Sequence, residues 1–191
     1  MRLVQAATLV LAATTLNAQD LPVLRHSPEF TIRTPDGSQT LLSSFHGKVV
    51  ALLFVHTTCP HCQHASEVFT RLYAEYGAKG FQPVAVAFNP MANLYVKDFV
   101  RDHGVTFPVG FSPPEDVLNY LNIPVVARYV VPQIVWIDRK GNIRSQTPPM
   151  GDEKLLGEAS WRATIEALVK EPATEPAHHT SAHHSTSAKT P

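Results

Sequence analysis

The residues best suited to chemistry in this chain are its only two cysteines, which stand three positions apart in Cys59-Pro60-His61-Cys62. A thiol pair at this spacing can form and break a disulfide, and the apolar run 49–55 just before it is typical of a buried strand. Apolar residues then recur at helical spacing, at Ala65, Val68, Phe69, Leu72, Tyr73 and Tyr76. The pattern therefore predicts that Cys59 lies at a helix N-terminus, where unpaired N–H groups and the helix dipole favour a thiolate.

Two other roles for the cysteines stay open beside redox chemistry. A structural disulfide between residues three apart closes a very short loop, so it constrains the unfolded chain little. A structural zinc site needs four ligands and the motif supplies two, while His56, His64 and His103 do not stand at a recognisable ligand spacing. The pattern favours redox exchange over both, and no cofactor or metal is required for it.

The N-terminal end has the character of a secretory signal peptide. Arg2 gives a short positive start, an apolar stretch follows over 3–16, and the small residue Ala18 precedes a polar segment. We expect a signal peptide over residues 1–18 with cleavage after Ala18. The stretch is shorter than the roughly 20 residues that span a bilayer, which argues against a polytopic membrane protein. Export to the periplasm or outside the cell would require a membrane or envelope partner that sets the redox state of the cysteines.

The C-terminal end differs from the rest in composition. Residues 171–191 are rich in Pro, Thr, Ser, Ala and His, without an aliphatic residue larger than alanine, so we expect a disordered tail. His178-His179 and His183-His184 within it are able to bind metal ions weakly. A solvated tail without a selected ligand role is the favoured interpretation.

Residues 19–170 have the length of one ordinary domain. Lys+Arg and Asp+Glu each number 16, and the absence of a basic patch makes nucleic acid an unsuitable partner. Periodicity predicts strands over 30–33, 40–42, 48–55, 81–88, 105–111, 133–137 and 142–144, and helices over 60–76, 93–103, 113–121 and 152–169. This alternation indicates an α/β fold with a largely parallel sheet, extended at one edge by the closing antiparallel hairpin.

Three stretches of the sequence carry a resemblance to a known family. They are Gly47-Lys48-Val49-Val50 leading to Thr57-Thr58-Cys59-Pro60-His61-Cys62, then Gly104 to Val109, and Val131 to Gly141. Over about residues 27–170 the chain resembles the thioredoxin superfamily, and within it the exported redoxins of the TlpA type. The resemblance implies a thioredoxin fold, a central mixed β-sheet flanked by helices, with an N-terminal hairpin extension and an inserted helix.

The family also implies roles for residues around the dithiol. The Val131–Pro132 peptide bond would be cis and lie beside the active site, although an ordinary trans proline is the alternative. The backbone of Val131 would pair with an extended substrate segment as an added strand, and Thr58 and Pro60 would also contact the substrate. Cys59 would be the nucleophile, and the more buried Cys62 would resolve the mixed disulfide.

The chain departs from the family at three positions. Thr58 stands where many members have tryptophan, and Gln133 follows the proline where threonine is usual. Leu53 occupies the position at which thioredoxins carry a buried carboxylate. A carboxylate from elsewhere or a water molecule would then have to accept the proton of the resolving thiol.

His61 bears on the direction of exchange. An imidazole between the cysteines can donate a hydrogen bond or a positive charge to the Cys59 thiolate, which makes the disulfide a stronger oxidant, and a solvated linker residue is the alternative role. Cys-Pro-His-Cys with Val131 before the proline resembles the pattern of disulfide-forming oxidases of the DsbA type. The remaining resemblance is to reductases. We therefore predict an exported thiol-disulfide oxidoreductase that exchanges disulfides with envelope proteins and acts as a reductase. A DsbA-like oxidase, a thiol peroxidase and a copper-binding redoxin are the alternatives.

Overall fold

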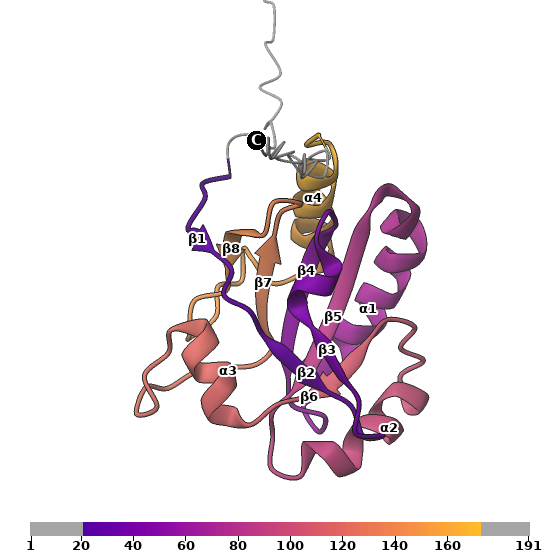
Figure 1. Cartoon of the computed structure of the whole chain (residues 1–191), viewed down its shortest axis with the longest axis vertical. Helices are drawn as coiled ribbons and strands as arrows, with labels where there is room; N and C mark the ends of the chain where they lie inside the picture. The colour runs from indigo at the N-terminus through magenta and orange to yellow at the C-terminus, as the bar shows by residue number, and fades with distance from the viewer. Residues whose placement is uncertain (1–20, 173–191) are drawn as a thin grey trace, which may run out of the picture.

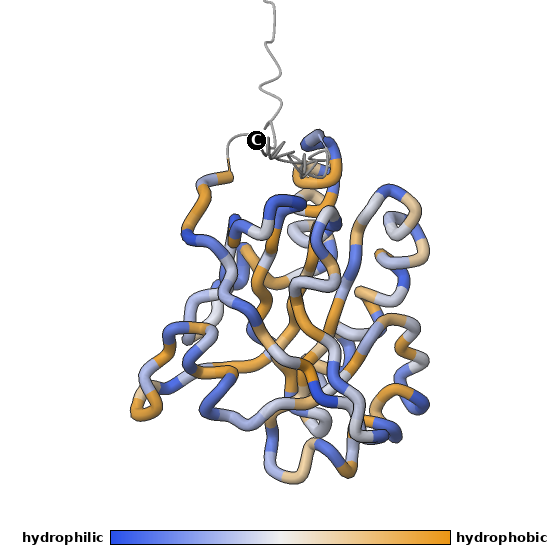
Figure 2. The backbone as a smooth tube through the Cα atoms, viewed as in Figure 1, coloured by the Kyte–Doolittle hydropathy of each residue, from blue (hydrophilic) through white to orange (hydrophobic). Residues whose placement is uncertain are grey.

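Strand β4 (Val49–Val55) lies in the middle of the sheet, and all seven of its residues are buried. A continuous apolar run is what a strand covered on both faces requires. It pairs in parallel with β5 (Phe81–Ala87) and antiparallel with β7 (Gln133–Ile137). Figure 2 shows the hydrophobic backbone colour gathered along the strands in the centre of the molecule.

A computed structural model describes residues 21–172 of the chain (Figure 1). The predicted signal peptide over residues 1–18 lies outside this range, as do both histidine pairs of the predicted tail. Within residues 21–172, no helix is both long enough and apolar enough to cross a membrane.

Within residues 21–172, eight strands form one sheet in the order β1-β8-β7-β4-β5-β6-β2-β3. The strands not yet introduced are β1 (Arg25–His26), β2 (Thr31–Arg33), β3 (Gln39–Leu41), β6 (Val109–Phe111) and β8 (Asn142–Gln146). Among the strand pairs of this described region, only β4–β5 and β5–β6 are parallel, so the largely parallel sheet expected from periodicity is wrong. Hairpins at both ends of the chain join the sheet and add antiparallel strands, the N-terminal one beyond β6 and the C-terminal one beside β4.

Helices cover both faces of the sheet and bury two apolar cores. Helices α1 (Pro60–Tyr76), α2 (Ala92–Asp102) and α4 (Glu158–Val169) pack on one face, and α3 (Pro114–Leu121) packs on the other. Short 3-10 turns, η2 (Leu42–Phe45) and η3 (Gly77–Lys79), lead into β4 and β5. The central mixed sheet, the hairpin β2–β3 and the inserted helix α2 agree with the fold predicted from the sequence.

Helix α4 begins six residues later than predicted, at Glu158 instead of Asp152. Gly157 has φ 143° and ψ 151°, a backbone conformation that a helix cannot pass through. Asp152 instead closes a turn, in which its carbonyl accepts from the backbone N–H groups of Leu155 and Leu156. Apolar periodicity continues through this turn, which is why the pattern misplaced the start of the helix.

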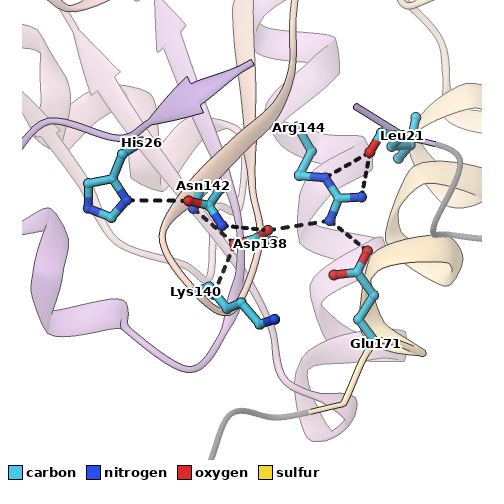
Figure 3. Close-up of polar contacts among 7 residues, drawn as sticks. All are labelled: Leu21, His26, Asp138, Lys140, Asn142, Arg144 and Glu171. Carbon is cyan, nitrogen blue, oxygen red and sulfur yellow. Dashed lines mark hydrogen bonds and ion pairs between the residues drawn. The ribbon is translucent and has the colours of Figure 1, made fainter. Parts of the chain in front are cut away.

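A buried ion cluster ties both ends of the described chain to the β7–β8 turn (Figure 3). The Arg144 guanidinium lies 3.3 Å from the Asp138 carboxylate and 2.7 Å from that of Glu171, and its Nε donates to the Leu21 carbonyl at 3.0 Å. The side chains of Arg144 and Asp138 are only 7% and 3% exposed. Because the cluster is buried, each charge depends on its partner for compensation.

Replacing Arg144 by methionine leaves the Asp138 carboxylate buried without its cation. We expect this change to lower the free energy of unfolding by about 3–5 kcal/mol, measured by urea denaturation. Arg101→Met is the matched control, because Arg101 pairs with Asp98 and Asp102 on an exposed surface. No measurable loss is expected there, and equal effects of the two substitutions would contradict this account.

Candidate active site

The two cysteines of the dithiol lie at the junction between β4 and α1. Cys59 is the N-cap residue of α1, Pro60 takes the first helical position, and Gln63 N–H donates to the Cys59 carbonyl at 3.0 Å as the first bond of the helix. Proline suits that position because its missing N–H has no partner to lose there. Both cysteines are free thiols, Cys59 half-buried and Cys62 fully buried. The predicted helix over 60–76 and the relative burial of the two thiols are confirmed.

The environment of Cys62 keeps its sulfur in the neutral form. Burial raises the pKa of the Cys62 thiol well above its ordinary value, and the neighbouring Cys59 raises it further. A hydrogen bond from the His56 backbone N–H to Cys62 Sγ, at 3.5 Å, opposes the increase in pKa. Leu53, the position of the carboxylate in thioredoxins, is fully buried in the apolar core.

The loop between β4 and α1 is held from two sides through Thr57. The Asn89 side-chain carbonyl accepts from the Thr57 backbone N–H at 2.9 Å and from its hydroxyl at 3.3 Å. Gln63 donates from its side-chain amide to the Thr57 carbonyl at 2.9 Å. Asn89 comes just after β5, and the carboxyl ends of neighbouring parallel strands meet at one edge of the sheet. These bonds fix the residues that lead into Cys59.

His56 packs its ring against an aromatic neighbour beneath this loop. The imidazole meets the Phe88 ring edge-on with centroids 4.6 Å apart, and Phe88 in turn lies 5.9 Å from the Tyr129 ring. Burial lowers the pKa of His56, so the neutral imidazole is favoured. The contacts link the dithiol loop to the segment that precedes the proline loop.

The proline loop lies against Cys59. The Val131–Pro132 peptide bond is cis, which confirms that prediction, and the Cys59 thiol faces the Val131 carbonyl with sulfur and oxygen 3.9 Å apart. Register between β4 and β7 pairs Phe54 with Gln133, so the residues just before β7 lie beside the end of β4. Segments more than 70 residues apart in the sequence are thereby brought together.

The other residues predicted from the motif surround this contact. Thr58, Pro60 and His61 are exposed at the start of α1, while Pro132 is buried. Sequence reasoning missed the bonds made by Asn89 and by the backbone of His56. The Asn-Pro pair after β5 marked the end of that strand, but only the strand pairing puts its side chain on Thr57.

The half-buried Cys59 and the buried Cys62 both lie outside the cavity at the other end of β4. That cavity has a volume of about 210 Å³ and is lined by residues that include His26, Glu29, Phe45, Lys48 and Asp138. Its lining contains none of the residues around the cysteines.

The sequence profile of the redoxin family matches residues 25–156, which include the dithiol, the proline loop and most of the sheet. The chain belongs to the redoxin family. Thiol-disulfide oxidoreductase ResA of Geobacillus kaustophilus is 29% identical over 62% of this chain and 64% of its own length. That of Bacillus anthracis is 24% identical over 67% of this chain and 70% of its own length. This redoxin thus spans just under two thirds of the first of these relatives.

Solved structures agree with the fold. A Chlorobium tepidum protein assigned as the thiol:disulfide interchange protein DsbE superposes with a TM-score of 0.62 and 26% identity, over 78% of this chain and 99% of that chain. A thioredoxin-family protein from Chlorobium tepidum TLS has a TM-score of 0.62 at 22% identity, over 76% of this chain and 96% of that one. The redoxin therefore has the predicted thioredoxin fold.

The unequal burial of the two thiols predicts unequal alkylation. In the reduced protein at neutral pH, iodoacetamide is expected to modify Cys59 and to leave Cys62 free until the protein is denatured, because the Cys62 thiol is buried and protonated. Mass spectrometry of tryptic peptides measures both positions. Equal labelling of the two cysteines under native conditions would disprove the assignment.

Proposed function

We propose that this redoxin is an exported thiol-disulfide oxidoreductase that reduces disulfides of envelope proteins through Cys59 and Cys62. The observation that carries the proposal is the contact at the start of α1, where the half-buried Cys59 faces the Val131 carbonyl and the buried Cys62 follows one turn later. The names of its relatives support the same activity.

The first step is attack by Cys59 on the substrate disulfide. The Cys59 thiolate bonds to one substrate sulfur, the substrate S–S bond breaks, and the other sulfur leaves as a thiolate that takes a proton from solvent. The positive end of the α1 dipole favours the attacking anion. A mixed disulfide between Cys59 and the substrate results.

The second step releases the substrate. Cys62 Sγ attacks Cys59 Sγ, the S–S bond between Cys59 and the substrate breaks, and the Cys59–Cys62 disulfide forms while the second substrate sulfur leaves. Two electrons have then passed from the protein to the substrate. Because burial raises the pKa of Cys62, this step needs a proton acceptor. The substrate sulfur bonded to Cys59 takes up the Cys62 proton as it leaves, so the substrate departs as a thiol.

A polypeptide substrate fits the surface around the dithiol. Val131 lies next to Cys59 and offers backbone groups with which an extended segment can pair as an added strand, while Thr58 and Pro60 border the path. Two apolar side chains next to Val131 or in the segment bonded to Val130 are exposed, Val130 at 38% and Met150 at 63%. Exposed apolar surface of this kind supports binding of another protein.

We also propose that the protein is exported and depends on a redox partner. The predicted signal peptide would deliver the protein to the periplasm or outside the cell, where a membrane or envelope dithiol partner must reduce the Cys59–Cys62 disulfide again. The reductase direction is supported by the family resemblance, and His61 is the residue that favours the opposite direction.

Substitution of each cysteine separates the two steps. Cys59→Ser is expected to abolish reduction of a disulfide-bonded protein, because no attacking thiolate remains. Cys62→Ser is expected to retain attack and to accumulate a mixed disulfide, visible as a larger species on non-reducing gels and removed by dithiothreitol. Full activity of the Cys59→Ser protein would overturn the proposal.

Replacement of His61 tests its influence on the direction of exchange. His61→Pro is expected to lower the reduction potential of the dithiol by about 30 mV, a tenfold change in the equilibrium constant, since the thiolate loses a stabilising group. His64→Ala, at another exposed histidine of α1, is the control and is expected to leave the potential unchanged. An unchanged reduction potential in the His61→Pro protein would show that His61 does not stabilise the thiolate.

A further inference from the structure

Gln133 lies where three parts of the site meet. It is the first residue of β7, directly after the cis-proline, and its backbone pairs with Phe54 near the end of β4. Its side chain is fully buried, and the amide nitrogen lies 2.8 Å from the Val130 carbonyl oxygen, 3.3 Å from that of Pro148 and 3.2 Å from that of Pro149. One side chain therefore joins the proline loop to the segment that follows β8.

The orientation of this amide follows from its surroundings. All three neighbours are carbonyl oxygens, so only the NH₂ end can face them, and its two hydrogens must be shared among three acceptors. The Val130 backbone N–H donates to the Pro149 carbonyl at 2.8 Å and closes the same junction from the other side. The two loops are thus bonded to each other twice, once directly and once through Gln133.

The oxygen of the Gln133 side-chain amide differs from the nitrogen in its hydrogen bonding. The Gln133 side-chain oxygen is buried and without a hydrogen-bond partner among the described residues. Leaving a buried acceptor unpaired costs stability, so the burial of a glutamine here is not explained by stability alone. What the amide does provide is a defined position for Val130, the neighbour of the residue whose carbonyl faces Cys59.

We propose that Gln133 is a positioning residue for protein substrates, which holds the Val130–Val131 backbone against the Pro148–Gly151 segment so that Val131 presents its backbone groups beside Cys59. The inference rests on the proposed function. It also makes the Pro148–Gly151 segment, with its exposed Met150, the second wall of the path along which an extended polypeptide would lie.

The loss of positioning is expected to affect a polypeptide disulfide and not a small one. Only a polypeptide can pair with the Val131 backbone, whereas 5,5′-dithiobis(2-nitrobenzoate) reacts with the thiolate alone. Gln133→Met keeps the side-chain volume and removes the donors, so kcat/KM for insulin reduction is expected to fall about tenfold, while the rate with the small disulfide stays within about twofold. Gln133→Asn, which keeps the amide but is too short to reach the three carbonyls, is a second variant with the same expectation.

Thr147→Val is the matched control. The Thr147 hydroxyl bonds the backbone N–H and the carbonyl of Ile134, so it joins the same pair of chain segments, and its side chain is also buried. Among the described residues, it has no hydrogen bond to the proline loop. This variant is expected to lose thermal stability and to keep both rates. Equal losses with insulin and the small disulfide in the Gln133 variants, or no loss with either, would overturn the positioning role. A wild-type protein that reduces neither disulfide would overturn the proposed function instead.

Discussion

Strand β4 pairs with β5 on one side and β7 on the other, and this pairing determines which loops lie beside the dithiol. All seven residues of β4 are buried, so a slip in register would move apolar side chains out of both cores. In the observed register, β5 ends beside β4 and places Asn89 on the dithiol loop, while β7 starts beside it and places Val131 on Cys59. Chemistry at the dithiol is therefore a consequence of how the middle of the sheet is packed.

The difference in burial gives the two thiols different roles in disulfide exchange. Cys59, at the N-cap, is reachable and close to the positive end of a helix dipole, whereas Cys62 lies inside the core and stays protonated. The pair needs no metal or cofactor for disulfide exchange, because the two sulfurs supply both electrons. The fold determines that Cys59 reacts before Cys62, and it places the Val131 backbone beside Cys59.

Much of this arrangement follows from the sequence, but the long-range contacts do not. The apolar run before Cys59 and the helical spacing after it were enough to place α1, and the family resemblance led to the cis bond before Pro132. Periodicity missed the two-residue strand β1 and the start of α4 at Glu158, and it overestimated the parallel share of the sheet, which the family resemblance gave correctly as mixed. They depend on pairing between distant segments or on one glycine conformation, and periodicity reports neither. The partners of Gln133 come from residues up to 16 positions away, so its part in the site is visible only in three dimensions.

The reduction potential of the Cys59–Cys62 pair decides whether this redoxin can act as a reductase. It is measured by equilibrating the full-length protein in glutathione or dithiothreitol redox buffers and quantifying the two thiols. For a reductase we expect a reversible two-electron transition with a potential nearer to that of thioredoxin, about −270 mV, than to that of DsbA, about −120 mV. A pair that does not exchange with the buffer, or a potential close to that of DsbA, would contradict this expectation.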